Sequence, residues 1–265
     1  CGDATLNLDP PCPEAAEPAR TMLGVQQEQW LLDTLSASTA AWNLIGNQVI
    51  LADSTFNGAV LNYDQWDGYP VARARLLQAF DDNDIQNLVV VTGDIHLAAV
   101  AQLRAGERGT GTPVGVEFVT TSISSDGLIG DELTDVLKSF PDLVDAELAH
   151  RGYSLHTVTP QRWTAEYRIV TDVDDVDSDV TSYGTYTVEA GSNSVLMMRR
   201  PPRDTLFPYP KLSRNQVLAM KSQKKARSPL QVMRRSQRIV KTHHVRAEER
   251  TSEARSPLNV TFAGC

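Results

Sequence analysis

Three segments of the chain carry apolar residues at helical spacing. In residues 23–35 the apolar positions recur every three or four residues while Gln, Glu and Asp fall on another face, which predicts an amphipathic helix. A second helix is predicted over residues 70–80, because Pro70 suits the first helical position, where its fixed φ is favourable and no amide hydrogen is needed. Residues 131–140 show the same spacing and are expected to form a third helix.

Between these segments lie runs that are typical of strands. Leu88–Val91 is continuously apolar, as expected for a strand that is buried on both faces inside an α/β sheet. The content of Ile, Val and aromatic residues predicts further strands within residues 41–51 and 115–127. Residues 152–159 and 162–170 alternate between apolar and polar positions, which predicts two antiparallel strands joined by a short turn.

Composition and charge divide the chain in two. The 265 residues are 41% hydrophobic, and no apolar run is long enough to span a bilayer, so we expect a globular protein. Residues 1–190 carry 29 acidic and 9 basic side chains, a net charge of −20, whereas residues 191–265 carry 4 and 16, a net charge of +12. We therefore expect a globular domain over 1–190 and a basic tail over 191–265 that is disordered or of artefactual origin.

Two side chains that can bind a metal follow the buried strand. Asp94 and His96 come directly after Gly93, at the carboxyl end of the strand, which is where α/β sheets bind ligands. A carboxylate oxygen and an imidazole nitrogen together suit iron, zinc or manganese. The alternative is that Asp94 caps the next segment and His96 is an ordinary packed histidine, and the Asp-x-His spacing alone does not decide between the two.

The motifs around this pair are more specific than the pair itself. Between Cys1 and Gly191 the chain contains, in this order, LGxxQxxWLLxxL, WNLIGNQVI, DQWDGYPxARxRLL, NLVVVTGDIH, GVEFVTTSISS and RGYSLHTVTPQRWTAEY. This series resembles the carboxyl-terminal half of the PhoD-type alkaline phosphatases, a family of metal-dependent phosphoesterases. The resemblance implies an α/β fold, the αββα sandwich of metallophosphatases, of which this chain holds an incomplete part.

The resemblance also implies roles for single residues. It maps an aspartate and a histidine of the family's metal centre onto Asp94 and His96, and it implies iron together with calcium, with other divalent metals as alternatives. It places Trp66, Asp67 and Tyr69 beside the substrate. The alternative for these three is an aromatic pair packed over a helix start, with Asp67 as the helix cap. An exported location (periplasmic, cell-surface or secreted) is a further implication of the family.

The match begins just upstream of residue 23, and the first half of the family's domain has no counterpart here. Two protein ligands do not hold a metal in a closed geometry, which takes three or more. We therefore expect a fragment that is inactive without the missing amino-terminal half. The acidic domain favours small phosphate esters or phospholipid headgroups over long nucleic acids as substrates of the complete enzyme.

The remaining candidates favour structural roles. We expect His156 to be a hydrogen-bonded core or edge residue rather than a ligand, and His150 has no stronger claim to the site. Ser122, Ser124 and Ser125 lack the surroundings of a serine nucleophile and fit a polar strand end. Cys1 and Cys12 could form a disulfide if the protein is exported, or remain unpaired.

The basic tail supplies the alternative function. Runs such as Lys224-Lys225-Ala226-Arg227 would attract nucleic acid or an anionic membrane, although no known nucleic-acid-binding motif accompanies them. On this alternative the chain is a non-catalytic remnant that binds such a partner through its tail.

Overall fold

The computed structural model describes residues 11–55, 58–60, 62–125, 137 and 140–198, and the backbone of 199 and 258–262. By their contacts these residues form one compact unit, Cys1–Pro202 together with Ser256–Cys265, and a second unit covers Arg203–Arg255. The second unit lies outside the described residues, so the predicted state of the tail stays a prediction.

The first of two sheets has five strands in the order β1-β2-β4-β3-β5. β1 is parallel to β2, and β2 is parallel to β4, whereas β3 pairs antiparallel with both β4 and β5. The bounds are Asn43–Gly46 (β1), Leu88–Thr92 (β2), Ala98–Ala105 (β3), Thr112–Val119 (β4) and Leu143–Glu147 (β5). β2 is buried at all five positions, as its apolar sequence predicts.

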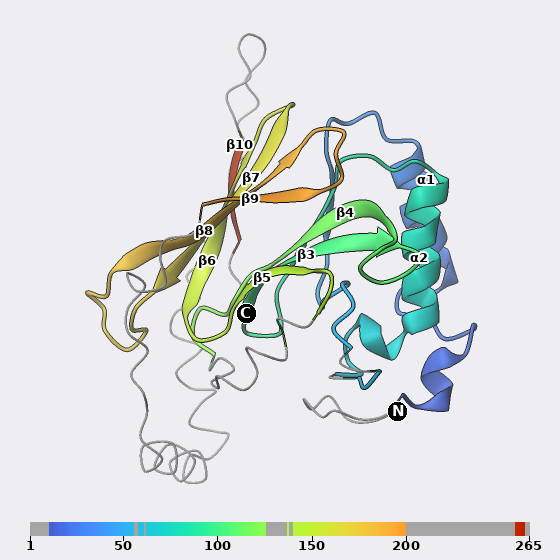
Figure 1. Cartoon of the computed structure of the whole chain (residues 1–265), viewed down its shortest axis with the longest axis horizontal. Helices are drawn as coiled ribbons and strands as arrows, with labels where there is room; N and C mark the ends of the chain where they lie inside the picture. Colours follow the sequence, from blue (N-terminus) through green and yellow to red (C-terminus); the bar gives the residue numbers. More distant parts are fainter. Residues whose placement is uncertain are drawn as a thin grey trace. The chain divides into compact units, whose positions relative to one another are not determined.

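Two helices lie on one side of this sheet and the second sheet lies on the other side (Figure 1). Helix α1 spans Val25–Ser36 and α2 spans Pro70–Asp82, so both predicted helices are confirmed, including Pro70 at the first helical position. Short 3₁₀ turns, η1 (Pro13–Ala16) and η2 (Trp66–Gly68), precede α1 and α2. The expected third helix lies outside the described residues apart from Leu137 and Phe140.

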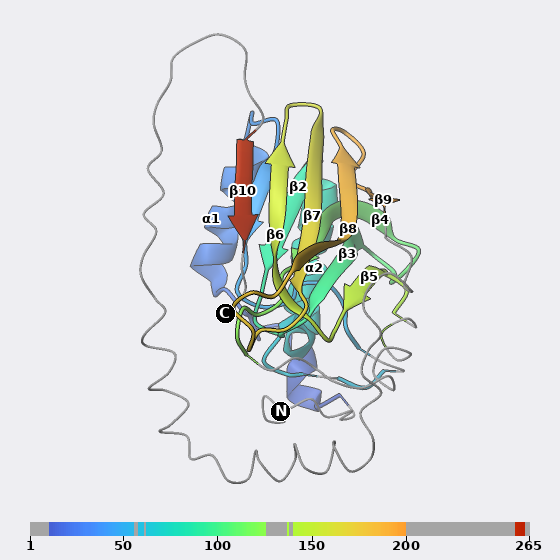
Figure 2. The same cartoon turned by 90° about the vertical axis from the view of Figure 1, so that its left-hand side faces the viewer.

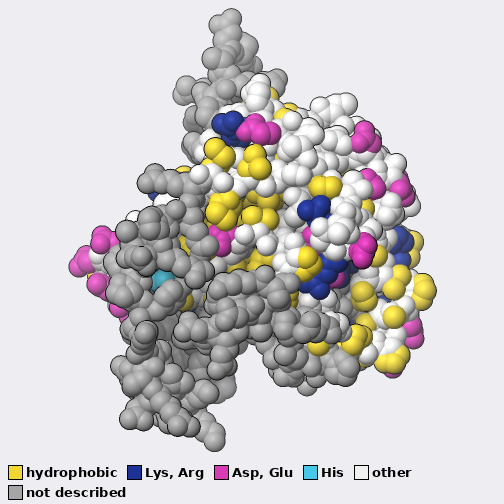
Figure 3. Space-filling model, in the orientation of Figure 1, with side chains coloured by type: hydrophobic (Ala, Val, Ile, Leu, Met, Phe, Trp, Pro, Cys, Tyr) yellow, Lys and Arg dark blue, Asp and Glu magenta, His cyan; other side chains and the backbone are white. Residues whose placement is uncertain are grey.

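The second sheet is antiparallel, with the order β10-β6-β7-β8-β9 (Figure 2). Its strands are β6 (Arg151–Val158), β7 (Arg162–Val170), β8 (Val180–Glu189), β9 (Val195–Arg199) and β10 (Leu258–Phe262). The predicted β6–β7 pair is confirmed. The sheet continues past the expected boundary at residue 190, since β9 pairs with β8 and β10 with β6. Hydrophobic side chains gather at the surface over β9 (Figure 3), where Leu196, Met197 and Met198 are exposed.

The layers present are therefore helices, sheet and sheet, three of the four layers of the expected sandwich. Among the described residues no helix covers the outer face of the second sheet, and none is long and apolar enough to cross a bilayer. One core lies between the helices and the first sheet and contains Leu76, Phe80, Leu88, Val90 and Leu103. Hydrophobic burial of this extent is the main stabilising contribution to the fold.

His156 lies between the two sheets and is completely buried. Its Nδ1 accepts a hydrogen bond from the Trp163 indole at 2.8 Å, and its Nε2 lies 3.0 Å from the Ser154 hydroxyl. Its ring also contacts Phe118 edge-on. Because burial disfavours the charged imidazole, the pKa of His156 is lowered to about 3. The structural role expected for this histidine is confirmed.

This burial makes the stability of the fold depend on pH. The unfolded chain binds a proton at His156 below about pH 6.5 and the folded chain only near pH 3, so stability falls as the pH drops between those values. We predict that His156→Gln is less stable than the wild type at pH 7, but loses roughly 2–3 kcal/mol less between pH 7 and pH 4.5. Urea unfolding at both pH values measures this, and equal losses in the two proteins would contradict it.

Candidate active site

Asp94 and His96 lie in the turn between β2 and β3, at the carboxyl end of the parallel strands. The Asp94 side chain is exposed and His96 is half-buried. Both residues have positive φ angles, 73° for Asp94 and 61° for His96. Non-glycine residues rarely adopt this region, and such strained backbone persists mainly at functional sites, where the surrounding structure compensates for a cost of about 1–3 kcal/mol each.

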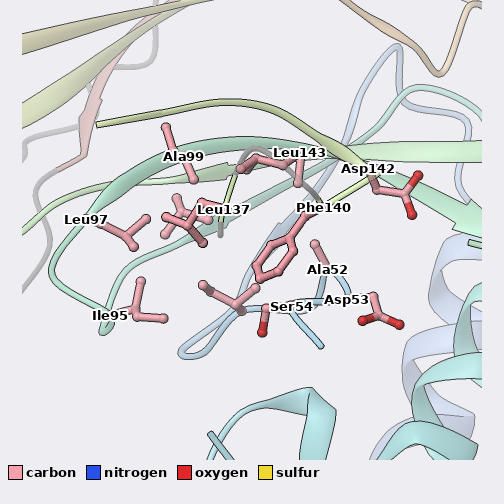
Figure 4. Close-up of a pocket in the computed structure, with 14 residues that line it drawn as sticks. Ala52, Asp53, Ser54, Ile95, Leu97, Ala99, Leu137, Phe140, Asp142 and Leu143 are labelled. Atoms are coloured by element: carbon pink, nitrogen blue, oxygen red, sulfur yellow. The ribbon is translucent and has the colours of Figure 1, made fainter. Parts of the chain in front are cut away.

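Ile95, between the two, fixes the turn from the inside. It lines an apolar cavity of about 50 Å³ together with residues of β3, β4 and the segment after β1. Figure 4 shows Ile95 and Leu97 on one side of this cavity, Ala52 and Ser54 on another, and the Phe140 ring across it. Because Ile95 is anchored among apolar side chains, its two neighbours keep a fixed place at the sheet edge.

Gln65 holds the Asp94 carboxylate. Its Nε2 donates to Asp94 Oδ2 at 2.7 Å, and its Oε1 accepts from the backbone N–H of Ile50 at 2.6 Å. Gln65 is only 1% exposed, so its side-chain amide has little access to water as an alternative hydrogen-bond partner. The carboxylate is thereby oriented through its neighbour, as ligating carboxylates in metal sites commonly are.

A second buried group, Glu117 of β4, fixes the segment that carries Ile50. Its carboxylate accepts hydrogen bonds from the backbone N–H groups of Leu51 (2.9 Å) and Ala52 (2.7 Å) and from the Thr92 hydroxyl (2.5 Å). Burial raises the pKa of Glu117, and these hydrogen bonds oppose the shift. The end of β2 and the segment after β1 are thus tied to one side chain.

His150 lies at the same edge of the first sheet as His96. The Thr121 hydroxyl is within hydrogen-bonding distance of the His96 carbonyl (3.4 Å) and of the His150 carbonyl (3.1 Å). His150 Nδ1 contacts Glu147 at 2.9 Å. Burial alone would raise the pKa of Glu147, but the hydrogen bond and charge of His150 lower it below its usual value. The His150 imidazole, in contact with the Glu147 carboxylate, therefore lies close to the Asp94–His96 turn.

The three residues expected beside the substrate occupy different environments. Trp66 and Asp67 are almost fully buried, at 2% and 1% exposure, whereas Tyr69 is half-buried and stacks under the Arg20 guanidinium at 4.4 Å. Asp67 does not cap α2, which has no side-chain cap; it accepts hydrogen bonds from Ser54 and Arg73. This geometry favours a structural role for Asp67.

Asp67 belongs to a partly buried ionic cluster that borders the apolar cavity through Asp53. Arg73 bridges Asp67 and Asp53, with 2.7 Å between Arg73 Nη2 and Asp53 Oδ2, and Arg108 lies 3.4 Å from Asp53. Burial and the neighbouring Asp53 raise the pKa of Asp67, an effect that Arg73 opposes. Burial would also raise the pKa of Asp53, but Arg73, Thr55 and Arg108 lower it. The opposite charges compensate one another. The cluster therefore stabilises the segment around Asp53 and does not present an uncompensated charge to a ligand.

The donor chemistry at the turn fits a metal ion only in part. A carboxylate and an imidazole are suitable ligands. Within the part of the chain that the structure describes, however, no three His, Cys, Asp or Glu side chains gather closely enough to hold a metal. The turn therefore brings together two potential donors, fewer than a closed metal site requires.

The serines and cysteines considered in the sequence lie outside the Asp94–His96 turn. The Ser122 hydroxyl donates to the Ser125 carbonyl at 2.8 Å, consistent with a polar strand end. Cys12 is disulfide-bonded, and the other two cysteines of the chain, Cys1 and Cys265, lie outside the described residues, so the pairing of Cys12 with Cys1 stays a prediction. Gln65 and Glu117 were not predicted, because a glutamine beside the WDGY motif and a glutamate within an apolar strand give no local signal of their partners.

The chain is similar to known proteins both in sequence and in fold. A sequence model of the family described as PhoD-like phosphatase matches residues 2–167. Alkaline phosphatase D of Bacillus subtilis (strain 168) is 35% identical over 187 residues, covering 68% of this chain and 32% of the relative. A solved structure titled "Structure of PhoD" matches with a TM-score of 0.67 and 31% identity, covering 73% of this chain and 38% of that one. The chain thus spans about a third of its curated relative.

We predict that Gln65→Leu destabilises the chain by about 1–3 kcal/mol, because the buried Ile50 N–H loses its acceptor. Gln78→Leu is the matched control, since Gln78 is an exposed residue of α2 that bonds only to nearby Asp82. Urea unfolding of both variants measures the difference. Equal stabilities would show that Gln65 does not brace this segment.

We predict that Asp67→Asn destabilises the chain by about 3 kcal/mol, because it leaves the buried Arg73 charge only partly compensated. Asp64→Asn, three residues earlier and exposed, is expected to change stability by less than about 0.5 kcal/mol. If Asp67→Asn were as stable as Asp64→Asn, the structural role of Asp67 would be excluded.

Proposed function

Because the chain belongs to the PhoD-like phosphatase family, we propose that it is part of a metal-dependent phosphoester hydrolase. The observation that carries this proposal is the Asp94–His96 turn, where two potential ligands are held in strained backbone at the carboxyl edge of the sheet. The activity belongs to the complete domain, and this chain contributes one part of its site.

In this proposal Asp94 and His96 are metal ligands. The family resemblance favours iron together with calcium, and the carboxylate–imidazole pair suits other divalent metals as well. Metal ions, when bound, would polarise phosphate oxygens and lower the pKa of a bound water. The remaining ligands come from polypeptide outside the described residues, since two donors do not complete a site.

The chain's own residues prepare this edge for a ligand. Gln65 donates a hydrogen bond to Asp94 Oδ2 and so restricts rotation of the carboxylate. Oδ1 and the remaining lone pairs are left for a cation. The turn carries Ile95, which lines an apolar cavity, and apolar surroundings strengthen nearby electrostatic interactions. Orientation of the Asp94 carboxylate and an apolar support for the turn are thus the contributions that this part of the domain makes.

The substrate class follows from chemistry and charge. We propose small phosphate esters or phospholipid headgroups, because the net charge of −20 over residues 1–190 disfavours long polyanions. An exported location is part of the proposal, and the disulfide at Cys12 supports it, since disulfides persist mainly in oxidising compartments.

The proposal is tested in a complete domain, made by fusing the preceding part of the relative's domain to this chain. We predict bound metal and hydrolysis of p-nitrophenyl phosphate or bis-p-nitrophenyl phosphate. Asp94→Asn or His96→Ala should lower both metal content and turnover at least about 100-fold, while circular dichroism stays unchanged.

Asp172→Asn in the exposed β7–β8 connection makes the same chemical change away from the site and should leave both quantities intact. Elemental analysis and initial rates provide the measurements. A folded complete domain with neither bound metal nor hydrolysis would refute the proposal.

A further inference from the structure

A polar pocket of about 260 Å³ lies between helix α2 and the second half of β3. The helix packs against this strand on the helical side of the first sheet (Figure 1). The volume is close to the lower end of the range typical of small-molecule sites, about 300–1,000 Å³. Neither Asp94 nor His96 lines the pocket, so its chemistry has to be considered by itself.

Three arginines line this pocket: Arg73 of α2, Arg104 of β3 and Arg108 of the β3–β4 connection. Two carboxylates, Asp53 and Asp142, line it as well. Asp53 forms ion pairs with Arg73 at 2.7 Å and with Arg108 at 3.4 Å, and Arg104 Nε donates to Asp142 at 2.9 Å. These ion pairs hold the long arginine side chains in place, so a ligand meets a wall that is already ordered.

The charges around the pocket are balanced. Two carboxylates line it beside the three arginines, and the buried Asp67 carboxylate pairs with Arg73 as the third. An ion that entered this pocket would lose water without gaining an uncompensated charge of opposite sign. A neutral polar ligand therefore suits the pocket better than an anion or a cation.

The wall still offers unused hydrogen-bonding groups. Arg73 bonds through its two Nη atoms, and Arg104 bonds through Nε and Nη1. Arg73 Nε and Arg104 Nη2 have no partner among the described residues, yet neither belongs to the fully enclosed side-chain atoms that lack one. Both donors are therefore open to solvent or to a ligand. Asp53 Oδ2 accepts from Arg73 alone and retains capacity as an acceptor.

The rest of the wall is apolar. Leu77 of α2 and Leu103 of β3 are buried side chains that line the pocket, together with Pro70 and Ala74. Ala74 is exposed, which places it at the entrance. The pocket thus combines donors, an acceptor and aliphatic surface, which matches a small molecule that carries hydroxyl groups on a carbon ring.

We propose that this pocket binds a small neutral sugar. Hydroxyl groups both donate and accept, so neighbouring hydroxyls of the sugar can bond to the unused arginine donors and to Asp53 at the same time. The C–H groups of the ring lie against the two leucines. The site goes beyond the proposed function, because it uses no residue of the Asp94–His96 turn and no metal.

Titration of the 265-residue chain with sugars, followed by ¹H–¹⁵N NMR, tests the proposal. The probes are D-glucose, D-galactose and D-mannose, and the side-chain Nε–H signals of Arg73 and Arg104 report on the pocket directly. We expect at least one sugar to shift these signals saturably, with half-saturation at about 1–10 mM, as expected for a neutral ligand of about twelve non-hydrogen atoms. Inorganic phosphate should produce no saturable shift.

Two variants locate the binding. Ala74→Trp narrows the entrance without removing a polar group, and Gln78→Trp is the matched control, since Gln78 is an exposed residue one turn later on α2 that does not line the pocket. The first should lower the affinity at least about tenfold and the second should leave it unchanged. Arg104→Lys keeps a positive charge for Asp142 but removes the planar fork, and should also weaken binding about tenfold.

Three results would overturn the proposal. The first is the absence of saturable shifts with all three sugars up to about 100 mM. The second is equal sugar affinity in the wild type, Ala74→Trp and Arg104→Lys, which would place the binding elsewhere. The third is a saturable response to phosphate in place of the sugars, which would assign the pocket to anions.

Discussion

The buried carboxylate of Glu117 connects the parts of the structure on which the candidate site depends. It lies inside β4 with no exposed surface and accepts hydrogen bonds from Thr92, at the end of β2, and from two amides of the segment after β1. Leaving a buried carboxylate without partners costs several kcal/mol, so these three donors and the carboxylate constrain one another. In the same segment, the Ile50 N–H donates a hydrogen bond to the Gln65 side chain, and Gln65 in turn donates one to the Asp94 carboxylate.

This chain of contacts accounts for the strained turn. Positive φ angles at Asp94 and His96 are unfavourable for residues with a Cβ, and they persist only where neighbouring contacts specify the backbone from several directions. Here Ile95 anchors the turn from below in an apolar cavity, Gln65 fixes the carboxylate, and Thr121 contacts the His96 carbonyl. The structure thus maintains an unfavourable local conformation to keep two potential ligands in one place.

The sequence was sufficient for those elements whose pattern is set by local burial. Local patterns predict three of these elements directly: the apolar run of β2, the proline at the start of α2, and the alternation of apolar and polar residues in β7. β3 was not predicted, because it is buried at nearly every position and its alanines carry little strand signal. For the site, Asp94 and His96 follow from their position after β2, whereas Gln65 and Glu117 act through partners 29 and 66 residues away, which no local pattern encodes.

Asp67 illustrates how a motif can also carry structural information. The sequence left open both a place near the substrate and a structural role at the helix start, and in the structure the Asp67 carboxylate pairs with Arg73, one turn inside α2. Arg73 also forms an ion pair with Asp53. The preceding residue, Ala52, donates its backbone N–H to the Glu117 carboxylate. The ionic cluster and the buried carboxylate therefore fix the same segment from its two ends. A motif of this kind marks the scaffold that supports the turn on which the two potential ligands, Asp94 and His96, lie.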